Sequence, residues 1–201
     1  MSQPREPRCL PVMNTTTARI PLVDEVNLLV RAMNWYTRRT YGAVMEPALA
    51  MAHNRKVLMA TMRYQSAASH WKTLDDSLKH LATLSAAATV GCSWCLDFGY
   101  WVSHTDGIDR SKLEAITSWR TSDVYTDLER RVIEYAEAMS MTPLTVTDEM
   151  VAGLSEHLSE AAVVELTAVI ALENVYSRSN AALGFHSQGF KDQCDIRPVS
   201  A

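Results

Sequence analysis

The sequence lacks a long apolar run and a surplus of basic residues. None of its 201 residues belong to an apolar stretch of about 18 residues, the length that crosses a bilayer, so we expect no membrane contact. The first residues contain no apolar core of a signal peptide, and we expect a cytoplasmic protein. The formal net charge is −4 and no basic stripe stands out, so we expect no nucleic-acid partner.

Residues that interrupt helices are also scarce. The chain has seven Gly and seven Pro, too few for long irregular tracts away from its ends. Hydrophobic residues make up 47% of it, and Ala, Leu, Met and Glu are plentiful, which favours helix over sheet. No strand pair or hairpin signal is visible. We therefore predict an all-α fold of about eight helices.

Apolar periodicity and capping residues indicate where these helices begin. The expected starts lie near residues 23, 54, 75, 93, 109, 126, 147 and 159. Gly42 and Pro47 are expected to break the pattern between the first two helices. The last helix is apolar on more than one side, so we expect it to be central and buried. We divide the chain into an extended arm over 1–20, one helical domain over 21–190 and a tail over 191–201.

Cysteine is rare, yet two of the four cysteines stand three residues apart. Cys92 and Cys95 follow Gly91 and open the helix expected from residue 93. One helical turn puts both thiols on one face, close enough for a disulfide, and such a pair can store two electrons. In a cytosolic chain this pattern indicates redox or metal chemistry. A structural zinc site takes four ligands, whereas Cys9 and Cys194 stand alone, so we expect no metal.

Three segments carry a resemblance to a known family: ARIPLVDEV, LKHLATLSAAATVGCSWCLDFG and LTAVIALENVYSRSNAALGFHSQGF. The chain resembles the carboxymuconolactone decarboxylase-like superfamily, which includes the alkylhydroperoxidase AhpD-type proteins. The resemblance implies an AhpD-like helical bundle with the CxxC at the N-terminus of a central helix. It also implies a thiol-dependent peroxide reductase, an oxidoreductase without a cofactor. Its partners would be a small-molecule peroxide, an external dithiol or protein reductant, and further copies in a homo-oligomer.

The chain departs from the family's peroxidase motif at three positions. Where the family has a Glu before the first Cys, a His between the two and a His after the second, this chain has His80, Trp94 and Gly99. Only the two thiols remain of the catalytic set that the resemblance implies. The missing His at Gly99 predicts a space beside the thiols. Either a bulkier substrate enters this space, or an aromatic side chain such as Tyr100 or Trp101 fills it.

Cys92, Cys95 and His80 are the candidate catalytic residues. In the predicted reaction one thiolate becomes a sulfenic acid and the other thiol condenses with it. The resemblance makes Cys95 the attacking residue, whereas the helix N-terminus lowers the pKa of a thiol at Cys92 more, so this assignment stays open. His80 is the candidate base, or else a polar residue at a helix edge. Asp97 points away from Cys95, and we expect it to be solvated or paired with a cation.

Trp94, Gly99 and Arg178 are the candidate substrate-binding residues. Arg178 shares a polar strip with Glu173 and Asn174, and we favour a pairing network between helices over an anion site there. An anion site would suit a second function, a lyase of the decarboxylase branch. A third is a non-catalytic helical module for redox sensing or interaction, whose thiols would oxidise without peroxide turnover. A separate alternative is that Cys92 and Cys95 are inert, as small buried hydrophobes. The CxxC favours the reductase, because the lyase chemistry needs no thiol pair.

Overall fold

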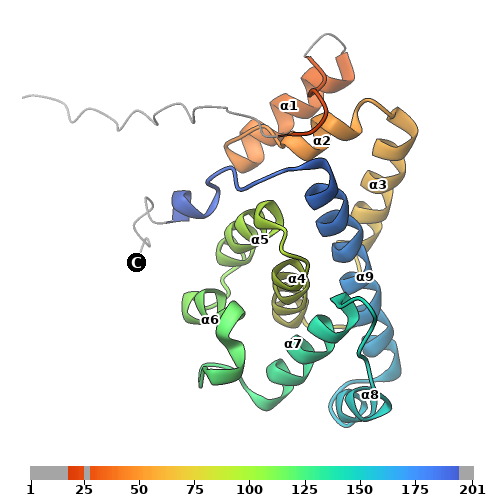
Figure 1. Ribbon diagram of the computed structural model, residues 1–201, viewed down its shortest axis with the longest axis vertical. Coiled ribbons are helices and arrows are strands. Elements are labelled where there is room, and N and C mark those ends of the chain that lie inside the picture. The colour runs from red at the N-terminus through yellow and green to blue at the C-terminus, as the bar shows by residue number, and fades with distance from the viewer. Residues whose placement is uncertain (1–17, 25–27, 195–201) are drawn as a thin grey trace, which may run out of the picture.

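The computed structural model describes residues 18–24 and 28–194, and this part of the chain is helical without any strand (Figure 1). The all-α prediction is confirmed, with nine α-helices and two short 3-10 helices among the described residues. In chain order they are α1 (Leu28–Tyr41), α2 (Glu46–Met51), α3 (Arg55–Ala68), α4 (Asp76–Val90), α5 (Ser93–Thr105), α6 (Arg110–Ala115), η1 (Ile116–Thr121), α7 (Asp127–Ser140), α8 (Asp148–Ser155), α9 (Glu160–Leu183) and η2 (Lys191–Cys194).

Helix α4 lies at the centre of the bundle, with α5, α7 and α9 packed around it (Figure 1). Its residues Leu81, Ala82 and Ala86 have no exposed surface, and small alanines let the neighbouring helices approach closely. The prediction that the last helix is the central one was wrong. Helix α9 flanks the core, and Val164 and Val175 on its outer side are 69% and 54% exposed. The apolar residues of α9 cover a wider arc of the helix than the face that packs against the core.

Capping residues set most helix starts as predicted. Thr126 and Glu129 form a reciprocal capping box at α7, and the Ser159 side chain accepts the N–H of Ala162 at the start of α9. The short helix α2 was missed, because Pro47 was interpreted as a helix breaker. Proline is tolerated in the first helical turn, where its missing N–H would have no partner within the helix, and Pro47 stands there.

A buried ion pair joins α4 to α9. Lys79 Nζ lies 2.5 Å from Glu165 Oε1, and the two side chains are 13% and 7% exposed. Burial opposes ionisation of Glu165, but the Lys79 ammonium and the N–H of Thr73 outweigh it and lower the pKa of the carboxyl group. The pair is one of the contacts that hold α9 against the central helix.

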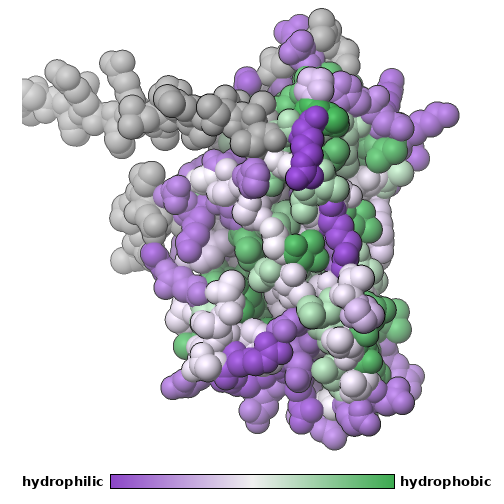
Figure 2. Space-filling view, viewed as in Figure 1, coloured by the Kyte–Doolittle hydropathy of each residue, from purple (hydrophilic) through white to green (hydrophobic). Residues whose placement is uncertain are grey.

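The outer helices carry exposed apolar side chains. In Figure 2 such side chains reach the surface over α1 and α2 and along the side formed by α3 and α9. Trp35 on α1 is 67% exposed and Met62 on α3 is 48% exposed. Within the described residues, no helix combines the length and hydrophobicity that crossing a membrane requires. The predicted arm over 1–20 falls almost entirely outside the described residues.

Candidate redox site

Cys92 and Cys95 form a disulfide at the N-terminus of α5. Helix α4 ends at Gly91, whose φ of +78° lies in the left-handed region that glycine adopts without strain. The chain then turns sharply, so that Cys92 caps α5 and its Sγ accepts the N–H of Cys95 at 3.2 Å. The two Cα atoms are 5.3 Å apart, a usual separation for a disulfide. Both residues are buried, at 1% and 5% exposure.

Two polar side chains from the C-terminal part of the chain reach this turn. Asn180, 4% exposed on α9, donates its Nδ2–H to Cys95 Sγ at 3.4 Å. His186, exposed just after α9, places its Nδ1 3.5 Å from the hydroxyl of Ser93. Neither residue was a predicted site residue, because no sequence spacing connects residues 180 and 186 to the CxxC. The turn after Gly184 brings them there.

Asp97 fastens the C-terminal segment onto α5. Its carboxylate accepts the backbone N–H groups of Gln188 at 2.8 Å, Phe190 at 3.1 Å and Lys191 at 2.7 Å. The expectation that Asp97 is solvated or paired with a cation was wrong, since it is 6% exposed and its partners are neutral amides. The helix face that it occupies is covered by the C-terminal segment rather than by water.

Trp94 belongs to an aromatic wall that packs beside the C-terminal segment. Its ring stacks on Phe98 at 5.1 Å between centroids, and Phe98 stacks on Trp101. The Trp94 Nε1–H donates to Gln188 Oε1 at 2.7 Å, and the residue is 6% exposed. These contacts give Trp94 a packing role beside the disulfide. Its predicted role in substrate binding stays a prediction.

A cavity of about 330 Å³ opens on the side of α5 that faces α6, η1 and the C-terminal segment. Leu96, Tyr100 and Ile116 contribute apolar walls, and Ser93 and Lys191 contribute polar groups. This is within the range of small-molecule sites. Ser93 lies between the thiols in sequence, so the cavity comes up to the CxxC turn, although neither cysteine is among its lining residues.

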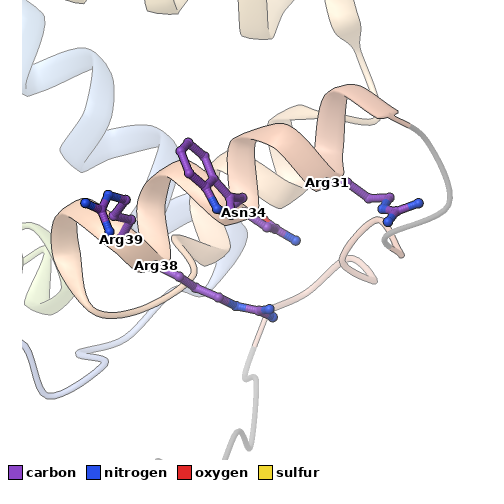
Figure 3. Close-up of a pocket in the computed structure, with 5 residues that line it drawn as sticks. Arg31, Asn34, Arg38 and Arg39 are labelled. Carbon is purple, nitrogen blue, oxygen red and sulfur yellow. The ribbon is translucent and has the colours of Figure 1, made fainter.

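A second, wider hollow of about 510 Å³ lies on α1 (Figure 3). Figure 3 shows Arg31, Asn34 and Arg38 pointing to one side of this helix and Arg39 to the other. It is lined by α1 residues and contains no thiol. Across the described ranges, no group of three or more His, Cys, Asp or Glu side chains is arranged to hold a metal ion.

Comparisons with known proteins agree with this architecture. A profile of the carboxymuconolactone decarboxylase family matches residues 55–138, which span α3 to α7 and include both thiols. The uncharacterized protein YnjA of Escherichia coli strain K12 is 31% identical over 172 residues, which cover 85% of this chain and 94% of YnjA. The chain belongs to the carboxymuconolactone decarboxylase family.

Solved structures place this family member among AhpD-like helical folds. A peroxidase-related protein from Ralstonia eutropha JMP134 with an alkylhydroperoxidase AhpD core has a TM-score of 0.76 at 14% identity, covering 91% of this chain and 96% of that protein. The debrominase Bmp8 without ligand has a TM-score of 0.75 at 23% identity, covering 91% and 98%. These likenesses show the fold.

The family position at Gly99 is closed in this chain. A Cβ built on Gly99 would lie 3.1 Å from Cδ2 of Leu84, so the Leu84 side chain occupies the space beside it. The prediction that Tyr100 or Trp101 fills the gap was wrong, and the entry of a bulkier substrate stays a prediction. The residue that fills the gap comes from the central helix α4, which the sequence around the CxxC could not indicate.

His80 faces the far end of α5 rather than the thiols. Its Nδ1 lies 3.1 Å from Ser103 Oγ and its Nε2 lies 3.1 Å from Asp106 Oδ2. Ser103 is eight residues beyond Cys95, or about 12 Å along the helix. His80 therefore cannot take a proton directly from Cys95. Burial lowers the pKa of His80, and the exposed carboxylate of Asp106 opposes this only in part.

The Ser103–His80–Asp106 arrangement has the order of a hydrolytic triad, but it lacks access. Ser103 is 1% exposed, and its hydroxyl also lies 2.7 Å from the carbonyl oxygen of Gly99. A nucleophilic serine needs a substrate within reach. The cluster instead ties the C-terminal end of α5 to α4.

Arg178 closes the corner between α9 and α7. Its guanidinium donates to the carbonyl oxygen of Ser140 at 2.8 Å, the hydroxyl of Thr142 at 3.1 Å and Oδ1 of Asn174 at 3.3 Å. These contacts form the pairing network that the polar strip predicted. The guanidinium is held by α7 and the residues that follow it, so the structure lends no support to an anion site at Arg178.

Proposed function

We propose that this chain is a thiol-dependent peroxide reductase whose redox couple is the Cys92–Cys95 pair. The observation that carries the proposal is the bond between these two sulfurs across the first turn of α5. A helix N-terminus stabilises a thiolate, because its N–H groups present partial positive charge. The same turn therefore suits the oxidised pair and the ionised, reduced pair.

The proposed cycle balances with a peroxide and an external dithiol. One thiolate attacks the outer oxygen of ROOH, becomes a sulfenic acid and releases an alcohol after the leaving oxygen takes a proton. The second thiol displaces water from the sulfenic acid and forms the disulfide. An external dithiol then reduces this disulfide by two exchange steps and is itself oxidised.

Two features beside the thiols support this cycle. The 330 Å³ cavity has an apolar wall and reaches Ser93, so it offers room for the organic part of a peroxide. His186, hydrogen-bonded to Ser93, takes the place of His80 as the proposed proton acceptor. An exposed imidazole can pass a proton directly to water, so no chain of buried proton-carrying side chains is required.

Reductive dehalogenation is a second candidate, favoured by Tyr100, an aromatic side chain in the wall of the 330 Å³ cavity. A dithiol can replace an aryl halogen by hydrogen with release of halide and a proton, and it ends as the same disulfide. An aromatic side chain in a cavity wall can stack on an aromatic substrate. The likeness of the fold to the debrominase Bmp8 agrees with this candidate.

A thiol titration tests the proposal. The variant Cys9→Ser/Cys194→Ser leaves only the central pair; it is reduced and then mixed with one equivalent of cumene hydroperoxide. We expect rapid loss of both thiols. When Cys92→Ser or Cys95→Ser is combined with this variant, no disulfide should form. A rate equal to that of free cysteine would contradict the reductase. Bromide release from a brominated pyrrole under the same conditions would then favour the dehalogenase.

A further inference from the structure

The sulfur of Cys95 has a side-chain donor that the sulfur of Cys92 does not have. Asn180 Nδ2 lies 3.4 Å from Cys95 Sγ, and both residues are almost fully buried. The described hydrogen bond to Cys92 Sγ comes instead from the backbone N–H of Cys95. The two sulfurs are therefore held from different elements, Cys92 by its own helix turn and Cys95 by α9.

An N–H donor stabilises a thiolate more than a thiol, because the negative charge strengthens the hydrogen bond. The backbone donor to Cys92 is present in any helix with a thiol at this cap. The donor to Cys95 depends on one side chain. Asn180 therefore acts on Cys95 against the preference for Cys92 that the helix N-terminus creates.

Charged groups on the surrounding elements are directed elsewhere. Asp97 on α5 is engaged with the backbone of residues 188–191, and His80 on α4 contacts Ser103 and Asp106. His186 contacts Ser93, on the Cys92 side of the turn. Glu173 on α9 lies two helical turns before Asn180 and is hydrogen-bonded to Ser177. Among the described residues, the side chain that donates a hydrogen bond to Cys95 Sγ is the neutral amide of Asn180.

We infer that Asn180 is a positioning residue that makes Cys95 the more readily ionised thiol of the reduced pair. Its amide donor directs negative charge to Cys95, although Cys92 caps the helix. This order of ionisation would give a physical reason for the attacking role that the family resemblance implies for Cys95. That role rests on the proposed function, whereas the order of ionisation does not.

Single-thiol variants measure the two pKa values separately. Cys92→Ser isolates Cys95 and keeps a helix cap, because serine caps helices well, and Cys95→Ser isolates Cys92. Each is combined with Cys9→Ser and Cys194→Ser, and the ultraviolet absorbance of the thiolate is followed against pH. We expect the lower pKa at Cys95. Asn180→Leu should raise the pKa of Cys95 by about 1, a tenfold change in its ionisation constant, and leave Cys92 unchanged.

Asn174→Leu is the matched control. Asn174 lies on the same helix and donates to Ser140, away from the thiols, so its loss should move neither pKa. Equal shifts in both variants would show a structural effect and overturn the inference. If Asn180→Leu does not fold, Asn180→Asp replaces it: the carboxylate removes the donor and adds a like charge, so Cys92 should become the more acidic thiol. A Cys95 that stays the more acidic would overturn the inference.

The outcome is separable from the test of the proposed function. A pKa of Cys95 that depends on Asn180, in a protein that does not react with peroxide, would refute the reductase and keep the positioning role. Rapid peroxide reduction, with thiol pKa values that do not depend on Asn180, would keep the reductase and refute the positioning role.

Discussion

The carboxylate of Asp97 accepts the backbone N–H of Gln188 at 2.8 Å and so ties the C-terminal segment to the thiol-bearing helix. Gln188 in turn reaches three places: Trp94 donates to its Oε1, as does the backbone N–H of Glu46, and its Nε2 donates to the carbonyl oxygen of Val44. One carboxylate thus connects α5, the segment after α9 and the start of α2. The walls of the redox site depend on this junction.

Replacement of Asp97 should loosen that segment before it unfolds the bundle. Hydrogen bonds to a charged acceptor contribute about 1.5–3 kcal/mol each, and Asp97→Ala removes three of them, so additive contributions give an expected loss of about 4.5 kcal/mol or more. Asp97→Asn keeps one acceptor oxygen and should cost less. Hydrogen exchange at residues 188, 190 and 191 measures the effect, and Asp192→Asn on the same segment is the control. Unchanged protection in Asp97→Ala would contradict the tie.

Local signals in the sequence were enough to predict the helical scaffold. Thr126 with Glu129, Ser159 and Gly91 each act within four residues of their own position, through caps and a left-handed turn. The same local signals misjudged which helix is central. Burial of α9 depends on which of its faces meets α4, and that is decided by contacts such as Lys79 with Glu165.

The site could be predicted only as far as the CxxC itself. The spacing of Cys92 and Cys95 is a local fact, and the disulfide follows from it. Asn180 and His186 reach the thiols because α9 passes α5 and the chain then turns back, which no spacing in the sequence expresses. His80 was assigned by its distance along the chain from Cys92, whereas the packing of α4 on α5 pairs it with the far end of α5.

His80→Gln should affect stability in acid more than it affects thiol chemistry. Burial lowers the pKa of His80 in the folded state, so the unfolded chain binds more protons as the pH falls below about 6.5. The native protein should therefore lose stability in acid more steeply than the variant, as melting curves between neutral pH and about pH 5 would show. The rate of peroxide reduction should fall less than the ~10²-fold typical of a lost general base. A larger fall would restore His80 to the catalytic set.

Glu173→Gln should stabilise the protein at alkaline pH. Part of the residue remains accessible, but desolvation of the carboxyl group raises its pKa to about 7, against an opposing hydrogen bond from Ser177. A raised folded pKa means that stability is fully present below the ordinary pKa of 4.5 and is lost as the pH rises toward about 7. A pKa raised by this amount corresponds to a loss of about 3 kcal/mol in the free energy of unfolding. The variant avoids this loss.

Denaturant unfolding at several pH values checks this expectation. The native protein and Glu173→Gln should be equally stable near pH 4.5 or below and diverge above it, with the variant more stable at about pH 8. Glu134→Gln, an exposed acid on α7, should show no such divergence. A Glu173→Gln variant that is less stable at all pH values would mean that the ionised carboxylate has a stabilising role.

Leu84 and Gly99 should behave as one packing unit. Because the Leu84 side chain occupies the space beside Gly99, Gly99→His alone should overpack this contact and cost about 1–3 kcal/mol. Leu84→Ala alone should cost about 2–5 kcal/mol through the cavity that it leaves. In the double variant the imidazole can enter that cavity, so the combined loss should be smaller than the two single losses added, by about 1 kcal/mol or more.

Urea unfolding of the two single variants and the double variant measures this coupling. Gly99→His combined with Leu113→Ala is the matched control, since Leu113 is a leucine buried in the same cluster that does not contact Gly99. In this control pair the two losses of stability should add. If the losses of Leu84→Ala and Gly99→His add as well, then the space beside Gly99 is not filled by Leu84. The double variant also places a histidine four residues after Cys95, where the family's peroxidase motif has one. A faster reaction of its reduced thiols with peroxide would show that Leu84 excludes the relay from this chain.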